Sequence, residues 1–137
     1  MTCHDADRID IVSPAGGVQS LTVRYGGAPF GIVTSPDGGT AYVSLFGSGE
    51  LVRFNTANRS TTGTLAIGPT PRALALSADG TRLYVTRFLS LKDDAEVWEV
   101  DTASLTRLRT FRIHKFHHVR RSYNISTCFS MTQSLFD

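Results

Sequence analysis

One stretch of this chain occurs twice, and this repetition limits the possible folds more than any other feature of the sequence. Residues 29–44 correspond to residues 71–86, an offset of 42 residues. The identical positions are Pro29 and Pro71, Ser35 and Ser77, Asp37 and Asp79, Gly38 and Gly80, Tyr42 and Tyr84, and Val43 and Val85. A repeat of this length predicts an array in which each unit is one small supersecondary structure stacked on the next.

A second pair of matching stretches follows the first. Residues 50–57 correspond to residues 96–103, now with an offset of 46 residues. The second repeat is therefore four residues longer, and the extra residues fall around Leu89–Asp94. We expect a loop there, because loops tolerate insertions better than the strands they connect.

Each repeat predicts four short strands and, within residues 7–113, no helix. Apolar runs at residues 32–34 and 74–76 predict a first strand that is buried on both faces. The Ser-x-Asp-Gly sequence that follows favours a tight hairpin turn. Alternation of apolar and polar residues predicts that the third strand is half exposed. The second, third and fourth strands are expected at residues 40–44, 50–55 and 64–67, and again at 82–86, 96–101 and 110–113.

The N-terminal residues predict the second half of another unit. Residues 8–12 are similar to residues 51–55, and residues 21–26 are similar to the end of the fourth strand. The predicted organisation is a half unit at residues 7–28 and full units at 29–69 and 70–113, with about ten strands. Residues 114–137 contain neither glycine nor proline and do not continue the repeat. We expect this basic tail to be irregular and disordered.

The repeat resembles that of the YVTN family of β-propellers, a group related to the quinoprotein amine dehydrogenase-like propellers. Tyr84-Val85-Thr86 matches three of the four letters that name the family, with Arg87 in place of the Asn, and Tyr42-Val43 matches two. The resemblance covers residues 7–113. It implies an all-β fold of four-stranded antiparallel blades and a bacterial or archaeal parent protein in the periplasm or outside the cell.

The predicted number of blades is too small for a closed ring. Propellers close with about four to eight blades, and this chain supplies two and a half. The sequence therefore predicts either a piece of a longer gene product or self-association through open strand edges. The abrupt loss of the repeat after Ile113 favours the first alternative.

The repeated residues predict structural roles and no catalytic ones. Tyr42 and Tyr84 are expected to lie between blades, and Asp37 and Asp79 to fix the hairpin turns. We predict a non-catalytic binding or scaffold surface that holds no cofactor. The alternative is that the chain is part of an enzymatic propeller, either a lactonase-like hydrolase or a redox enzyme. This section would be inactive without the remaining blades. The polar loop residues available to such an enzyme are Glu50, Arg53, Arg87, Asp93 and Asp94.

Charge and cysteine content exclude several classes. The net charge is +2, and the basic residues after residue 101 are too sparse to predict a nucleic-acid partner. No apolar stretch is long enough to span a membrane, and the N-terminus lacks the apolar segment of a signal peptide. Cys3 and Cys128 are expected to be free thiols. The sequence therefore does not identify a partner. The candidates are further blades of the parent protein and a second copy of this chain.

Three histidines in the tail provide the sharpest metal-site pattern in the sequence. His114, His117 and His118 would converge on zinc or copper if their segment were helical, with Cys128 as a fourth ligand. Lys115 and the neighbouring arginines oppose a bound cation. We predict no metal site and name the three histidines as the ligands to test.

Overall fold

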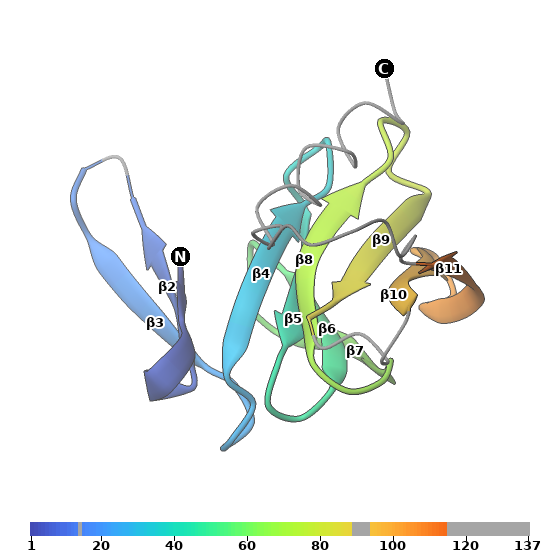
Figure 1. The fold of residues 1–137 in the computed structure, drawn as a ribbon. Helices are drawn as coiled ribbons and strands as arrows, with labels where there is room; N and C mark the ends of the chain where they lie inside the picture. Colours follow the sequence, from blue (N-terminus) through green and yellow to red (C-terminus); the bar gives the residue numbers. More distant parts are fainter. Residues whose placement is uncertain (14, 89–93, 115–137) are drawn as a thin grey trace.

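The computed structural model describes residues 1–13, 15–88 and 94–114, which form three antiparallel β-sheets (Figure 1). The only helical element among these residues is a short turn, η1 (His4–Ala6). The first sheet contains β1 (Thr2–Cys3), β2 (Arg8–Val12) and β3 (Val18–Thr22). The second contains β4 (Pro29–Thr34), β5 (Thr40–Leu45), β6 (Glu50–Asn55) and β7 (Thr61–Ala66). The third contains β8 (Pro71–Leu76), β9 (Arg82–Arg87), β10 (Asp94–Asp101) and β11 (Thr106–His114).

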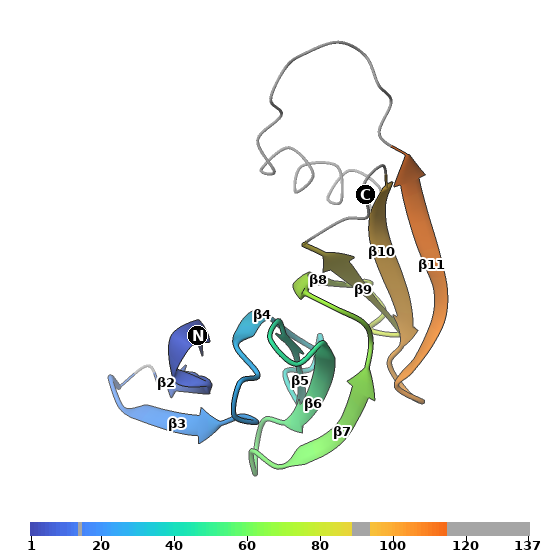
Figure 2. The same ribbon diagram turned by 60° about the horizontal axis from the view of Figure 1, so that its bottom comes forward.

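The sheets have the topology of propeller blades. In each four-stranded sheet the strands pair in sequence order, from β4 to β7 and from β8 to β11. The sheets are fanned, with β4 and β8 on the inside of the fan and β3, β7 and β11 on the outside (Figure 2). The all-β partial propeller predicted from the repeat is therefore confirmed. The predicted tail, residues 115–137, lies outside the described residues.

The two hairpin turns of the repeat share one set of hydrogen bonds. The amide of Thr40 donates to Ser35 Oγ (2.9 Å), and the amide of Gly39 donates to Asp37 Oδ1 (3.0 Å). In the second repeat the amide of Arg82 donates to Ser77 Oγ (2.9 Å), and that of Thr81 donates to Asp79 Oδ1 (3.1 Å). Gly38 and Gly80 follow the aspartates with φ of 71° and 72°, a conformation that favours glycine.

The turn at Asp79 predicts a loss of stability in acid. Hydrogen bonds from Ser77 and Thr81 lower the pKa of the Asp79 carboxyl from 3.8 to about 2. The unfolded chain therefore binds the proton first, so the stabilisation is complete above pH 3.8 and is lost as the pH falls to about 2. Asp79→Asn should reduce the fall of the urea midpoint across this window, with midpoints near pH 6 as the control. Equal acid sensitivity of the variant and the native chain would contradict the prediction.

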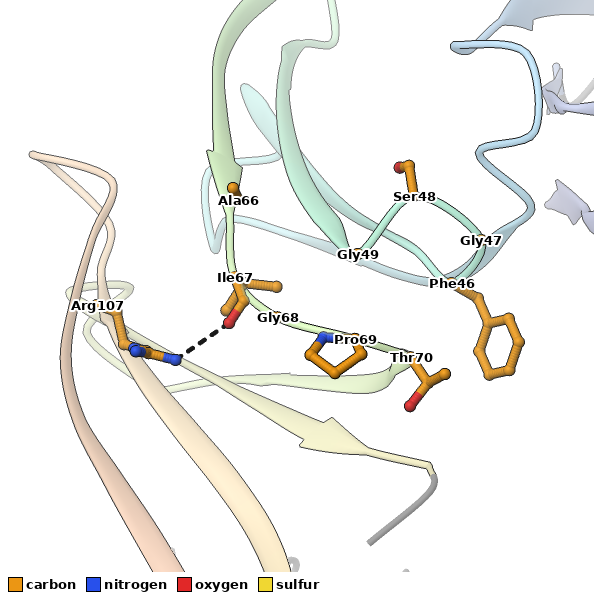
Figure 3. Close-up of a pocket in the computed structure, with 10 residues that line it drawn as sticks. All are labelled: Phe46, Gly47, Ser48, Gly49, Ala66, Ile67, Gly68, Pro69, Thr70 and Arg107. Atoms are coloured by element: carbon orange, nitrogen blue, oxygen red, sulfur yellow. Dashed lines mark hydrogen bonds between the residues drawn. The ribbon is translucent and has the colours of Figure 1, made fainter. Parts of the chain in front are cut away.

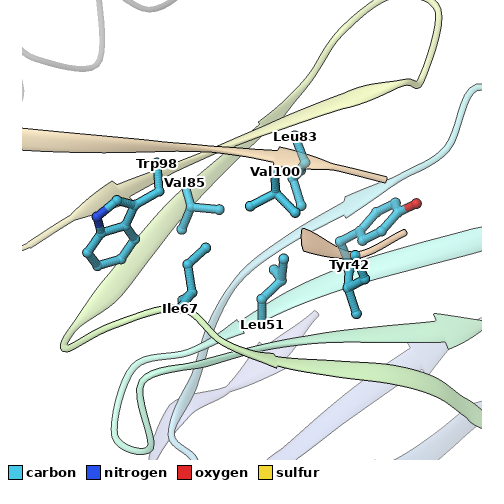
Figure 4. Close-up of a cluster of buried hydrophobic side chains, with 8 residues drawn as sticks. Tyr42, Leu51, Ile67, Leu83, Val85, Trp98 and Val100 are labelled. Carbon is cyan, nitrogen blue, oxygen red and sulfur yellow. The ribbon is translucent and has the colours of Figure 1, made fainter. Parts of the chain in front are cut away.

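Two apolar clusters join the three sheets. The first lies between the first and second sheets and contains Ile9, Val23, Val43, Leu45, Val52 and Phe54. The second lies between the second and third sheets and contains Tyr42, Leu51, Ile67, Leu83, Val85, Trp98, Val100 and Leu105 (Figure 4). Successive residues of a strand point to opposite faces, so Tyr42 faces the third sheet and Val43 faces the first. The second sheet is therefore buried on both faces.

Several details differ from the sequence-based expectations. Ile32 is 41% exposed, although its strand was predicted to be buried on both faces, because β4 is an edge strand at the inside of the fan. The outer strands β7 and β11 begin directly after their turns, at Thr61 and Thr106, and so are longer than predicted. The first sheet also contains β1, which the repeat did not indicate. The half-exposed alternation expected of the third strands is wrong in both repeats. In β6 the neighbouring residues Leu51 and Val52, which point to opposite faces, are both buried, and in β10 Glu96 and Glu99 are buried.

Candidate functional site

An open groove lies where the turn after β5 meets the connection between β7 and β8 (Figure 3). Its volume is about 590 Å³, and residues 46–49, residues 66–70 and Arg107 line it. The backbone amides of Ile67 and Gly68 donate to the Gly49 carbonyl (3.0 and 3.2 Å), which fixes one wall. A side chain at Gly49 would place its Cβ 2.8 Å from the Gly68 carbonyl oxygen, so this wall requires glycine. Arg107 donates to the Ile67 carbonyl at 3.1 Å.

Phe46 connects this groove to a group of three phenylalanines and one arginine. The Phe46 ring lies 6.2 Å from that of Phe30 and 5.8 Å from that of Phe88, between ring centres. The guanidinium of Arg72 lies over both of these outer rings. The groove and this cluster provide backbone carbonyls, aromatic faces and cationic groups. Such groups can hold a ligand through hydrogen bonds, stacking and charge.

Arg53 and Gly63 form the contact between the second sheet and the turn before β11 of the third sheet. Arg53 and Gly63 are paired across β6 and β7. Arg53 Nη1 donates to the carbonyls of Thr102 (2.9 Å) and Ala103 (3.2 Å), which belong to the turn before β11. A Cβ on Gly63 would lie 2.8 Å from Leu105 Cδ2, so glycine leaves the space that Leu105 fills.

The third sheet carries different residues at these two positions. Glu99 corresponds to Arg53 in the repeat, and Arg109, its partner across the strands, corresponds to Gly63. Glu99 is only 3% exposed. It pairs with Arg109 and, at 3.6 Å, with Arg82 Nε. The hydrogen bond to Glu99 raises the pKa of Arg109 above its ordinary value.

The polar loop residues considered for an enzyme form separate contacts. Glu50 pairs with Arg24 at 3.1 Å, Arg87 pairs with the buried Glu96 at 3.0 Å, and Asp94 pairs with His114. Arg53 bonds to the turn carbonyls, as described above. Asp93 lies outside the described residues. Among the four that are described, no two bond to each other.

The predicted metal ligands lie largely beyond the described part of the chain. His114 is the last described residue, and His117, His118 and Cys128 lie outside it. Residues 1–13, 15–88 and 94–114 contain no group of three or more metal-ligating side chains. Cys3 is a free thiol that contacts Asp10 Oδ2 at 3.2 Å. No helix in the described ranges has the length and apolarity needed to cross a bilayer.

Comparison with solved structures identifies the fold. Hydrazine synthase of Kuenenia stuttgartiensis superposes with a TM-score of 0.73 at 24% identity, over 82% of this chain and 33% of that chain. Apo AztD from Citrobacter koseri superposes with a TM-score of 0.63 at 18% identity, over 79% of this chain and 30% of that one. The chain thus spans about a third of the length of these β-propeller proteins. No protein-family model matches the sequence, and no curated protein matches it at a significant level.

Proposed function

We propose that this chain is a YVTN-type section of a larger exported β-propeller and that it acts there as a binding or scaffold surface. The repeated sequence, the packing of the sheets in series and the short coverage of the solved propellers support this proposal. The neighbouring blades would belong to the same parent protein.

The outward face of the third sheet is the main support for this proposal. On the second sheet, the equivalent face buries Tyr42 and Leu51 against β9 and β10. On the third sheet, Tyr84 occupies the position of Tyr42, paired across the strands with Glu99. Phe111 and Ile113 of β11 are 38% and 58% exposed. An apolar surface that continues an established packing pattern favours one more blade as its partner.

The charged pair on this face defines which blade fits. Arg109 occupies the space that Gly63 leaves open on the second sheet, so a blade with a residue like Leu105 in its outer turn would collide with it. Glu99 accepts hydrogen bonds where Arg53 donates them. The neighbour should therefore have a different outer turn, with carbonyls or carboxylates facing Arg109.

The test is to extend the reading frame and to express the chain with any repeats that follow or precede it. In the extended protein, amide hydrogen exchange in β9 and β10 should slow by about tenfold or more, because their second face becomes covered. Amides of β5 and β6 serve as the control, since both faces of these strands are already packed.

Absence of an in-frame repeat, together with a monomer by light scattering, would overturn the proposal. A defined dimer of the present chain would instead favour a second copy as the neighbour.

An enzymatic parent is the alternative. Solved structures with this fold include a putative 6-phosphogluconolactonase from Bacteroides uniformis (TM-score 0.61, 20% identity, covering 84% of this chain and 37% of that chain). They also include an inactive variant of virginiamycin B lyase from Staphylococcus aureus (TM-score 0.62, 14% identity, covering 83% and 36%). These identities support the common fold alone. Lactone hydrolysis by the extended protein, measured against the present chain, would favour the alternative.

A further inference from the structure

Among the described arginines, Arg72 is distinguished because its guanidinium lies over two aromatic rings, whereas that of Arg109 lies over one, Phe111. The Arg72 Cζ lies 4.6 Å from the ring centre of Phe30 and 4.2 Å from that of Phe88. By contrast, Arg8, Arg24, Arg82, Arg87, Arg109 and Arg112 each pair with a carboxylate. Among the described residues, no carboxylate lies within ion-pair distance of Arg72.

The repeat explains how this cluster arises. Phe30 and Arg72 are equivalent residues at the second positions of β4 and β8. Phe46 and Phe88 are also equivalent, and each directly follows the second strand of its sheet. Because β4 packs against β8, the two equivalent pairs meet at the same end of the fan. Adjacent backbone contacts fix this geometry, since the Ser44 hydroxyl donates to the Arg72 carbonyl at 2.7 Å.

The contacts leave the hydrogen-bonding edge of the guanidinium available. Aromatic rings stabilise an arginine through its flat faces, whereas its five N–H donors lie in the plane. Arg72 is half-buried, so its charge is less screened than that of a fully exposed arginine. Phe30 is 39% exposed and offers an apolar surface beside these donors.

We propose that Arg72 binds a carboxylate that carries an apolar group. The two carboxylate oxygens would accept hydrogen bonds from the guanidinium, and the apolar group would lie against Phe30. The rings hold the guanidinium in place, so little side-chain freedom is lost on binding. The carboxylate can belong to a free organic acid or to an acidic side chain of a neighbouring blade, and these two sources share the same chemistry.

The experiment titrates the 137-residue chain with benzoate and with acetate. Binding is followed by calorimetry and by the Nε–Hε signal of Arg72 in ¹H–¹⁵N spectra. We expect benzoate to bind more tightly than acetate and Arg72→Met to weaken benzoate binding by at least about tenfold. Arg72→Lys should give an intermediate loss, because it keeps the charge but not the planar fork. The matched control is Arg59→Met, which removes an exposed arginine that lacks aromatic contacts and should leave the affinity within about twofold.

Three outcomes would overturn the proposal: unchanged affinity in Arg72→Met, equal losses in the two methionine variants, or no binding up to about 50 mM benzoate. If Arg72→Met does not fold, the test rests on the benzoate titration of the native chain. Benzoate must then shift the signals of Arg72 and Phe30 more than the signal of Arg59. The extended protein distinguishes the two sources: benzoate binds to it if the natural ligand is free, and is excluded if a neighbouring blade supplies the carboxylate. This test does not depend on the proposed function, because it uses the present chain first.

Discussion

Trp98→Ala is expected to lower the free energy of unfolding by about 3–5 kcal/mol, the range for loss of a buried aromatic side chain. Trp98 is 2% exposed and lies in the cluster between the second and third sheets. It is paired across the strands with Val85, and its ring lies against the backbone of Gly68. Removal of the indole leaves a cavity where two sheets meet. Urea unfolding followed by far-ultraviolet circular dichroism measures the loss, since the variant lacks the only tryptophan.

The matched control for Trp98→Ala is Phe111→Ala on the outward face of the same sheet. Phe111 is 38% exposed. Its removal should cost less than about 1 kcal/mol, because partly exposed positions away from the core contribute little. Equal losses in the two variants would contradict the packing of the third sheet on the second.

Gly31→Ala is expected to lower the free energy of unfolding by about 1–3 kcal/mol through overpacking. A Cβ at this position would lie 2.4 Å from the Arg72 carbonyl oxygen and 3.0 Å from Ser44 Oγ. The first contact is with the backbone of β8, so no side-chain rotation relieves it. The same substitution disturbs the hydrogen bond from the Gly31 amide to Ser44 Oγ (2.8 Å). Thermal and urea unfolding both measure the effect.

The repeat supplies the control for this glycine, because Ala73 occupies the equivalent position in β8. The Ala73 amide likewise donates to a hydroxyl oxygen, Thr86 Oγ1, at 3.1 Å. Ala73→Gly should therefore cost no more than about 1 kcal/mol, the entropic cost of glycine in a strand. If Gly31→Ala is as stable as the native chain, β4 and β8 do not approach as closely as described.

The strand order and the packing side of many residues follow from the repeat alone. The Ser-x-Asp-Gly turns and the apolar positions around Tyr42 and Val43 are local signals, and both recur at a fixed offset. A signal that recurs in two units is less subject to chance than one that occurs once. The all-β partial propeller could therefore be predicted without a structure.

The buried charges could not be predicted in this way. Glu96 and Glu99 stand among apolar residues in β10, and acidic residues in a strand ordinarily indicate positions in contact with solvent. Their burial depends on Arg87, Arg109 and Arg112, which reach them from the neighbouring strands. Such pairing depends on the register between strands, and short sequence patterns do not encode it.

The Arg72 cluster was also missed, although the sequence held a signal. Phe46 and Phe88 are equivalent in the repeat, as are Phe30 and Arg72. The candidate sites predicted from the sequence were polar loop residues and histidines, which are the side chains of catalysis and metal binding. Aromatic residues that recur with an arginine at the same end of successive units are the pattern that indicates this cluster.

The pair Glu99–Arg109 has a consequence for growth of the array. A repeat whose two faces fit each other has no intrinsic end, and copies that add head to tail form filaments. Gly63 leaves an opening for the turn of the following sheet, whereas Arg109 closes the equivalent opening on the last described sheet. An identical copy therefore cannot repeat, on the outward face of the third sheet, the contact that joins the second and third sheets. The Glu99–Arg109 pair thus favours a neighbouring blade of different sequence over head-to-tail growth from copies of one unit.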